Sequence, residues 1–400
     1  MTCFQASHQH NALIRAADTV DVVDAVYGQG RHAGELAHGG QPLAEQRSLH
    51  GGKAVADLFS TAVLRLRGED AFRWLHSLTT QKVDDLSPGV STETLVLSPT
   101  GHIEHWLRII AASDGDGMWL LVDSDPQPVM DFFERMKFMM RAELVDESAH
   151  YQCVGVVSAD SDFPLLQHLP HAAVWYDPWP NIGVGGASYA VWDEGQPQAA
   201  AEHPGFHTRF AVAVCPKRRL GEAMPHAEVP VVGRDAWEAL RIAACRPAPS
   251  DCDHKALVGE YDLLRTAVHL AKGCYRGQEA VARVHNVGQT PRRLVFVHLD
   301  GSEHVLPQPG SPITAEVRGA RREVGRLCSV TQHYELGPVA LGVVKRNLDT
   351  NADLQIVTSE DGEENLHLAA SAELVVVPNR SSQVKTVRRN PEVDQRSFRR

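Results

Sequence analysis

The stretch Lys272-Gly273-Cys274-Tyr275-Arg276-Gly277-Gln278-Glu279 gathers a thiol, two glycines and several polar or charged side chains into eight consecutive residues. No other part of the chain is as dense in reactive groups. Glycine permits positive φ and lets the backbone come close to a ligand, so this stretch is predicted to be a loop rather than the interior of a helix or strand. We expect the loop to contact a bound molecule.

Length and composition limit the class of protein. A chain of 400 residues exceeds what one hydrophobic core usually supports, which predicts two or three domains. The hydrophobic content of 43% is ordinary, and the formal charge of -11 argues against a protein built around wrapping nucleic acid. The 21 histidines show no ligand spacing on an identifiable element, so they predict no metal site.

The seven cysteines predict free thiols in a reducing compartment, because an odd number in a long chain does not suggest a disulfide framework. The nearest pair, Cys245 and Cys252, is seven positions apart, so a built-in zinc or iron–sulfur site is not expected. The N-terminus lacks a basic region followed by a long apolar run, and no stretch approaches about 18 apolar residues. We predict a cytoplasmic protein.

The order of expected elements predicts two α+β domains. Residues 1–52 have weak apolar periodicity and are predicted to be an irregular leader without chemistry. Residues 53–150 and 151–290 each combine strands of a largely antiparallel sheet with helices over one face, and the second domain ends in the Cys274 loop. The expected strands are Ala62–Arg67, Thr92–Leu97, Ile103–Ile110, Met118–Val122, Tyr151–Val157, Tyr189–Trp192 and Phe210–Val214. The expected helices are 69–78, Val129–Met140 and Asp235–Ala244.

The C-terminal part consists of short β-like apolar runs separated by turns, which predicts a small all-β domain over residues 291–378. Its expected strands are Arg293–Leu299, Ile313–Val317, Val324–Val330, Val339–Val344 and Leu354–Val357. Residues 379–400 are rich in arginine and almost free of apolar side chains. They are expected to be a solvated tail or, alternatively, a weak and salt-sensitive contact with RNA or an acidic partner.

The eight-residue loop, continued by Val281-Ala282-Arg283, resembles the signature of the YgfZ branch of the YgfZ/GcvT folate-binding family. The resemblance covers roughly residues 55–375. Further blocks that resemble the family are 68–71, 75–81, 97–101, 335–338 and 344–346. The resemblance to this family implies an α+β fold with two sheet-plus-helix domains and a C-terminal β-barrel. The three domains are arranged around a central channel that binds tetrahydrofolate or a one-carbon derivative.

The resemblance also bears on activity. Some members of the wider family are the aminomethyltransferase of the glycine cleavage system and carry paired aspartates just after the glycine turn that Gly101 matches. This chain has His105 and Trp106 there, and a neutral Trp cannot take the role of a carboxylate toward an amine, which argues against glycine-cleavage chemistry. The YgfZ branch is implicated in maintaining iron–sulfur enzymes and in tRNA modification, which makes iron–sulfur proteins expected partners.

Cys274 and Lys272 are the predicted catalytic residues. Lys272 and Arg276 lie two positions to either side of the thiol, and cations so close in sequence would favour the thiolate if the fold brings them into contact. A nucleophilic or redox-active thiol follows from this pattern. The alternative is that Cys274 is a small buried filler, since free cysteines are among the most buried residues.

Three further loop residues are candidates for binding the cofactor. Tyr275 offers a flat face for stacking on a pterin or aminobenzoyl ring, with ordinary core packing as the alternative. Gln278 and Glu279 could hydrogen-bond to an aminopyrimidinone edge, or they could simply begin a helix whose dipole they complement.

Two candidates outside the loop come from positions that match the family. Arg241 could pair with the glutamate carboxylate of folate, or could be a surface arginine on a helix. Glu260 matches a glutamate that often follows a proline in the family, but here Val258-Gly259 precede it. Cys245 also replaces a glycine of the family pattern, so the two departures leave the ligand-side geometry of this region open.

Three function hypotheses follow. The preferred one is a folate-binding protein that supports iron–sulfur proteins or tRNA modification through Cys274. The enzyme alternative is a tetrahydrofolate-dependent aminomethyl or methyl transferase, which the missing aspartates disfavour. The third is a non-catalytic scaffold that holds a protein or RNA partner through its basic tail and its thiol. None of the three requires a membrane or a metal.

Overall fold

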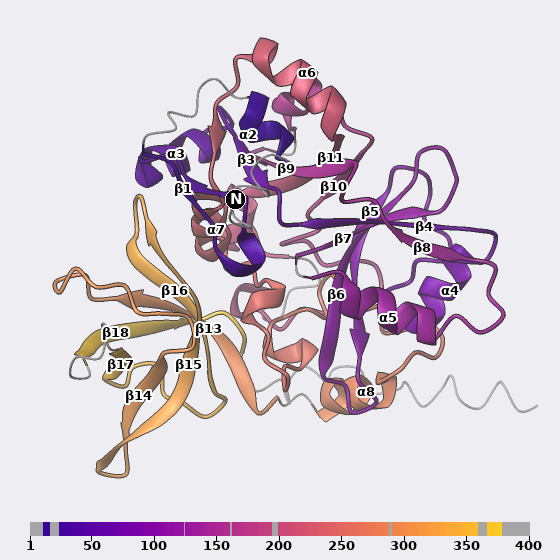
Figure 1. Cartoon of the computed structure of the whole chain (residues 1–400). Helices are drawn as coiled ribbons and strands as arrows, with labels where there is room; N and C mark the ends of the chain where they lie inside the picture. Colours follow the sequence, from indigo (N-terminus) through magenta and orange to yellow (C-terminus); the bar gives the residue numbers. More distant parts are fainter. Residues whose placement is uncertain are drawn as a thin grey trace, which may run out of the picture.

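The computed structural model describes residues 11–16, 24–123, 125–160, 162–193, 199–287, 290–358 and 366–377. Two five-stranded sheets and a closed barrel of six strands dominate these residues, as Figure 1 shows. This confirms the predicted α+β class with a C-terminal β-barrel. The predicted basic tail, 379–400, lies outside the described residues.

The first sheet has the strand order β5-β6-β7-β4-β8 and is antiparallel throughout. Helix α4 buries Trp74, Leu75 and Leu78, and helix α5 places Phe133 edge-on against Trp74. The strands are β4 (Ala62–Arg67), β5 (Ser91–Leu97), β6 (Ile103–Ala111), β7 (Met118–Val122) and β8 (Glu143–Asp146). The helices are α4 (Ala71–Leu78) and α5 (Gln127–Arg135). Alternating and continuous apolar runs made these elements, except β8, predictable from sequence.

The second sheet has the order β10-β11-β9-β3-β12. Its strands are β3 (Val55–Leu58), β9 (Tyr151–Ser158), β10 (Ala173–Tyr176), β11 (Arg209–Pro216) and β12 (Val231–Val232). Two helices belong to it, α6 (Lys217–Ala227) and α7 (Arg234–Ala243). β3 was not predicted, and it pairs with β9, so a segment assigned to the first domain, 53–150, completes the second sheet instead. Helix α7 packs so closely that a Cβ on Gly155 would lie 2.6 Å from the Trp237 ring.

The N-terminal segment corrects the prediction of an irregular leader. Its described part contains α2 (Ala12–Ala16), β1 (Val26–Tyr27), the 3₁₀ turn Gly30–His32, β2 (Leu36–His38) and α3 (Pro42–His50). Asp57 on β3 holds this segment, because its carboxylate accepts hydrogen bonds from the Asn11 side chain at 2.7 Å and from the Leu36 amide at 2.8 Å. The pattern was missed because α3 buries only two side chains, Gln46 and Leu49, which is too few to give a helical apolar period.

The barrel closes in the order β13-β16-β15-β14-β17-β18. Its strands are β13 (Arg292–Leu299), β14 (Pro312–Val317), β15 (Ala320–His333), β16 (Gly337–Lys345), β17 (Leu354–Thr358) and β18 (Leu366–Leu374). All five predicted strands are present, and β18 is an addition. Closure pairs every barrel strand on both sides, which leaves no exposed edge.

The expected strand Tyr189–Trp192 is wrong. Ala190 makes an isolated bridge with Val376, and a 3₁₀ turn follows over Val191–Asp193. Further 3₁₀ turns are Pro164–His168, Pro204–His207, Pro249–Asp251 and Val258–Glu260. The short apolar run suggested a strand because such runs do not distinguish a strand from a buried turn by periodicity.

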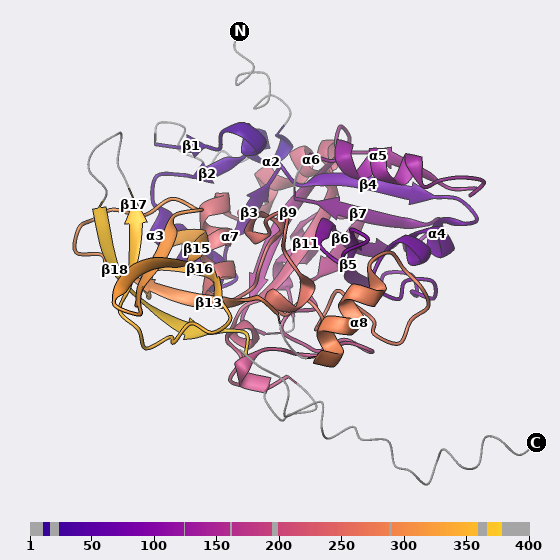
Figure 2. The same cartoon turned by 90° about the horizontal axis from the view of Figure 1, so that it is seen from below.

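The segment between α7 and the barrel packs against the first sheet and the barrel and connects them to the second sheet. A core cluster combines Trp106 of the first sheet, Tyr261 and Leu264 of this segment, and Leu294 and Leu341 of the barrel. Helix α8 (Gln278–Val287) follows the Cys274 loop, and in Figure 2 it lies beside β5 and β6. Across the described residues, no helix has both the length and the apolar character needed to cross a membrane.

Candidate functional site

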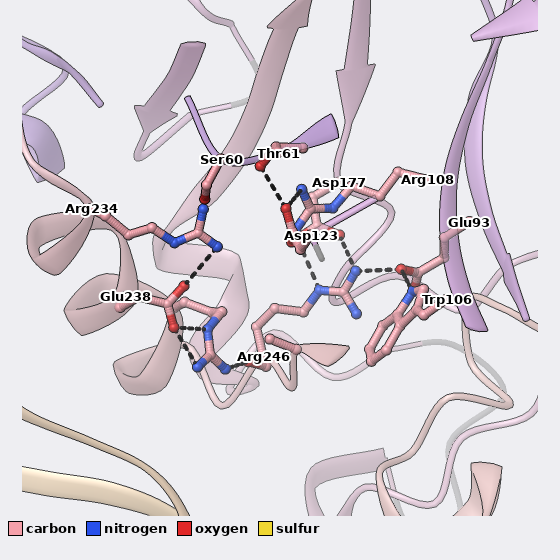
Figure 3. A network of polar contacts seen from close by, with 12 residues as sticks. Ser60, Thr61, Glu93, Trp106, Arg108, Asp123, Asp177, Arg234, Glu238 and Arg246 are labelled. Carbon is pink, nitrogen blue, oxygen red and sulfur yellow. Dashed lines mark hydrogen bonds and ion pairs between the residues drawn. The ribbon is translucent and has the colours of Figure 1, made fainter. Parts of the chain in front are cut away.

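Arg246 is buried in the interior, just after α7. The chain turns at Cys245, whose φ of 51° is left-handed, and this turn carries Arg246 into the interior. Its Nε donates to Asp177 at 3.1 Å and its Nη2 donates to Glu93 at 2.6 Å. The guanidinium carbon lies 5.3 Å from the ring centroids of both Trp106 and Trp179, so two indoles and two carboxylates fix its plane. Figure 3 shows this arrangement.

A second buried ion pair joins Arg108 on β6 to Asp123, the residue after β7. The Arg108 nitrogens lie 3.2 and 2.5 Å from the two carboxylate oxygens, and the Thr61 hydroxyl donates to the same carboxylate at 2.7 Å. Burial alone would raise the pKa of Asp123, but Arg108 and Arg234 outweigh it and hold the pKa below its usual range. Asp123 is therefore an ionised hydrogen-bond acceptor at neutral pH.

Arg241, a predicted folate ligand, lies beside these pairs but is fully engaged by protein groups. Its Nε donates to Glu238 at 2.9 Å, its Nη1 to Asp251 at 3.0 Å, and its Nη2 to Ser329 on β15 at 2.8 Å. These bonds tie α7 to the barrel. The geometry therefore favours a structural role for Arg241, and the surface-arginine alternative is wrong because the side chain is buried.

Glu260, the other predicted ligand outside the loop, is also engaged. Its carboxylate is fully buried and accepts from Arg292 on β13 at 2.7 and 3.1 Å, and from the Leu257 amide at 3.2 Å. Arg292 also pairs with Asp253 at 2.6 Å. This geometry makes Glu260 a clamp between the connecting segment and the barrel.

Three adjoining hollows lead from the surface to these ion pairs. The inner hollow, of about 20 Å³, is lined by Trp106, Arg108, Leu121, Asp123, Trp175, Asp177, Phe210, Trp237, Arg241, Arg246, Pro247 and Pro249. The middle hollow, of about 170 Å³, is lined by Ile103, Glu104, His105, Trp106, Val122, Asp123, Val129, Pro249 and Cys252. The outer hollow, of about 820 Å³, is lined by Ser98, Thr100, His102, Ile103, Glu104, His105, Pro128, Asp131, Phe132, Arg135, Cys252, Asp253, His254 and Arg276. Shared lining residues show that each hollow adjoins the next.

The Cys274 loop meets the outer hollow through Arg276, which pairs with Glu104 at 2.8 Å. Gly277 has a φ of 82°, and a Cβ there would lie 2.6 Å from the Ser98 carbonyl oxygen, so only glycine lets the loop rest on the turn of residues 97–101. Two blocks that resemble the family, far apart in sequence, are therefore in contact at the mouth of the hollows.

The thiol of Cys274 is exposed, which excludes the buried-filler alternative. Its two flanking cations point to other groups. The Lys272 ammonium donates to the carbonyl oxygens of His76 at 2.5 Å, Thr79 at 2.6 Å and Gln81 at 3.0 Å, at the C-terminal end of α4. Burial lowers the pKa of Lys272 to about 8, so it is still protonated at neutral pH. These contacts do not support the expected activation of the thiol. Lys272 binds backbone carbonyls, and Arg276 forms an ion pair with Glu104.

The positions of the remaining loop candidates fit the structural alternatives, which are core packing for Tyr275 and a helix start for Gln278 and Glu279. Tyr275 is buried in the core cluster and burial raises its pKa to about 12, so its ring is not presented to a ligand. Gln278 begins α8 and donates to the Lys272 carbonyl at 3.4 Å, while Glu279 is exposed in the first turn of the same helix. Both suit a helix N-terminus.

A further hollow, of about 640 Å³, lies between the N-terminal segment, α7 and β15. Glu35 and Arg234 on its wall pair with each other at 3.4 Å, and Ser60 donates to Glu35 at 2.9 Å. The N-terminal segment, for which no chemistry was expected, therefore forms one wall of a cavity.

Sequence reasoning missed the central residues Glu93, Arg108, Asp123, Asp177 and Arg246. Asp123 directly follows the fully buried strand β7, but in an antiparallel sheet this position alone does not predict a ligand site. The other residues meet only through the tertiary fold.

Comparison with known proteins agrees with this architecture. No protein-family model matches the chain. A candidate chloroplastic transferase of Arabidopsis thaliana is 27% identical over 319 residues, which cover 74% of this chain and 66% of that protein. The tRNA-modifying protein YgfZ of Cronobacter sakazakii is 28% identical over 145 residues, or 36% of this chain and 43% of that protein.

A solved structure, the glycine cleavage system aminomethyltransferase T from Bartonella henselae, superposes with a TM-score of 0.64 at 15% identity and covers 89% of this chain and 94% of that one. This likeness shows the fold. The chain is thus similar in sequence to a chloroplastic transferase and to YgfZ, and similar in fold to a GcvT aminomethyltransferase, without distinguishing between them.

Proposed function

We propose that this chain is a folate-binding protein that takes tetrahydrofolate or a one-carbon derivative into the three adjoining hollows. The observation that carries the proposal is the ionised carboxylate of Asp123, which lines both the inner and the middle hollow next to the indole of Trp106. A flat heteroaromatic ring with adjacent N–H donors matches a wall that combines an aromatic face with a buried acceptor.

The ring occupies the middle hollow in this proposal. The aminopyrimidinone edge donates from an amino group and a neighbouring ring nitrogen, and a carboxylate such as Asp123 can accept both hydrogen bonds. Val129 and Pro249 supply apolar surface on the same wall. Because Arg108 keeps Asp123 ionised, the acceptor is present without any change of protonation on binding.

The glutamate tail lies in the outer hollow. Arg135 and Arg276 line that hollow, and guanidinium groups recognise carboxylates in a bidentate manner. The tail then ends beside the loop that carries Cys274, since Arg276 belongs to both. This places the exposed thiol near the mouth rather than at the ring.

Cys274 supplies the reactive group for a partner or substrate that approaches from solvent. We propose support of iron–sulfur proteins or of tRNA modification, the latter because one relative is named a tRNA-modifying protein. A cytoplasmic location remains the prediction from sequence. Aminomethyl transfer is disfavoured, because Trp106 stands where a carboxylate would be needed and its indole N–H is bound to Glu93 at 2.8 Å.

The test is a titration of tetrahydrofolate, its methylene derivative and its formyl derivative against the wild type and Cys274→Ser, with the rate of thiol alkylation followed in parallel. We expect saturable binding to both proteins, and a thiol rate in the wild type that changes as folate saturates. Absence of saturable binding to either protein would contradict the proposal. Loss of binding in Cys274→Ser alone would place the ligand at the loop instead.

A further inference from the structure

Buried polar nitrogen atoms nearly always have a hydrogen-bond partner, so one that has no partner among the protein atoms calls for an explanation. Among the described residues, such atoms occur on Arg65, His203, Arg246, His269 and Arg293. Of these side chains, Arg246 is the one that lines a hollow described above. Its unpartnered atom is Nη1, in a residue that is only 5% exposed.

The direction of this nitrogen is fixed. Nε and Nη2 of Arg246 are bound by Asp177 and Glu93, and the flat faces are covered by Trp106 and Trp179. In Figure 3 the remaining terminal nitrogen of Arg246 has no dashed contact. A planar guanidinium held at two nitrogens cannot turn the third toward another acceptor, so its two N–H groups are preorganised donors.

The charges around Arg246 select the class of acceptor. Glu93 and Asp177 already supply two carboxylates to this one cation, with distances of 2.6 and 3.0 Å to Nη2. An added phosphate or carboxylate would face both of them at close range. A neutral carbonyl oxygen gains the hydrogen bond without that repulsion, so it is the acceptor that fits.

We propose that Nη1 of Arg246 donates to the ring oxo oxygen of the bound folate, so that Arg246 selects oxo pteridines against diamino analogues. The proposal rests on folate binding as proposed above and adds the residue that reads the ring. The inner hollow of about 20 Å³ has room for about one water-sized group, so only the edge of the ring enters it. In a diamino analogue an N–H donor replaces the oxo oxygen and would face the Arg246 donors.

A site built to hydrogen-bond one group rejects an analogue that cannot make the bond, because its buried partner stays unpaired. We therefore expect the wild type to bind tetrahydrofolate at least about tenfold more tightly than the diamino analogue. Arg246→Lys keeps a cation for Glu93 and Asp177 but cannot hold a donor at the Nη1 position. Its affinity ratio for the two ligands should fall at least about threefold below the wild-type ratio, and the remainder reflects the ring N–H to Asp123 that the diamino analogue also lacks.

Arg293→Lys is the matched control. Arg293 is also buried and also carries unpartnered nitrogens, but it does not line the hollows described above. Its substitution should leave the affinity ratio at the wild-type value. A general loss of stability would weaken both ligands by the same factor and leave the ratio unchanged, so the ratio separates recognition from folding.

The experiment measures dissociation constants of tetrahydrofolate and its diamino analogue for the wild type, Arg246→Lys and Arg293→Lys by equilibrium dialysis. A high ratio in the wild type and Arg293→Lys, with a low ratio in Arg246→Lys, supports the inference. Equal binding of the two ligands by the wild type, or a ratio that survives Arg246→Lys, overturns the inference and leaves folate binding intact. If neither ligand binds the wild type, the proposed function fails and the inference fails with it.

Discussion

The loop of residues 272–279 and the buried centre around Asp123 differ in how exposed their functional groups are and in what those groups contact. In the loop, the reactive thiol of Cys274 faces solvent while its charged neighbours Lys272 and Arg276 bind the scaffold. In the centre, Arg108 and Arg246 are buried against carboxylates and aromatic rings, and Nη1 of Arg246 has no hydrogen-bond partner among the described residues.

This difference separates reactivity from recognition. The loop is contiguous in sequence, and its lysine and glycine serve to seat it on the first sheet. The centre is assembled from strands and turns that are far apart in sequence, and it carries the groups that can recognise a ring. If the account is right, changes in the centre should alter folate binding, and a change of the thiol should not.

The largest effect is expected for Asp123→Ala. It removes the ring acceptor and leaves Arg108 buried without its carboxylate, which should lower the free energy of unfolding by about 3–5 kcal/mol. Folate affinity of the folded protein should fall by about a hundredfold, as expected when a buried charge-assisted contact to the ligand is lost. Urea unfolding and a folate titration measure the two effects.

Asp123→Asn is the matched control, because it keeps the shape and an acceptor oxygen for Thr61 but removes the charge. It should bind folate better than Asp123→Ala and worse than the wild type. Wild-type affinity in Asp123→Ala would show that the ring binds elsewhere. It would contradict the claim that the buried centre, and not the Cys274 loop, recognises the ring.

Lys272→Met should have the next largest effect. It removes three hydrogen bonds to the carbonyls of residues 76–81 and should cost about 1–3 kcal/mol of stability, with the thiol alkylation rate at neutral pH within about twofold of wild type. Lys82→Met, at a partly exposed lysine nearby, should cost clearly less stability than Lys272→Met. A large drop in thiol reactivity at unchanged stability would instead make Lys272 an activator of Cys274.

A smaller effect is expected from pH. The folded pKa of Asp123 lies below its unfolded value, so its contribution to stability is complete above the unfolded pKa of about 4 and is lost as pH falls through the lower folded pKa. Between pH 5 and pH 3 the Tm of the wild type should fall by about 1–2 °C more than that of Asp123→Asn, which cannot titrate there. Parallel acid limbs in the two proteins would mean that Arg108 does not stabilise the carboxylate.

The smallest physical effect is expected for Cys274→Ser. Because the thiol is exposed, stability should stay within about 0.5 kcal/mol and folate affinity should be unchanged, whereas activity of iron–sulfur enzymes in cells that depend on this chain should be lost. Cys245→Ser, which places a hydroxyl in the core, should cost about 1–3 kcal/mol. Normal cellular activity of Cys274→Ser would remove the thiol from the mechanism.

Much of the fold could be predicted from local pattern. β4, β6 and β7 have apolar runs that are either alternating or continuous, and the barrel strands are short apolar runs between turns. β3 was missed because four residues carry little pattern, and its partner β9 lies about 95 positions away, a separation that periodicity does not register.

The candidate site was less predictable for the same reason. Cys274 stood out because the residues around it in sequence are unusual. However, the Lys272 ammonium does not lie beside the thiol, because it donates a hydrogen bond to the Thr79 carbonyl at the end of α4. The contact between Glu93 and Arg246 joins residues 153 positions apart, and such pairs are visible only once the sheets have packed.

The central claim is that folate binds with its ring in the middle hollow, and a crystal structure of the complex with tetrahydrofolate tests it most directly. The account predicts density for the ring against Trp106, with the amino edge within hydrogen-bonding distance of the Asp123 carboxylate and the tail leading toward Arg276. A ring bound at the Cys274 loop or in the hollow beside the N-terminal segment, with the middle hollow holding only water, would contradict it.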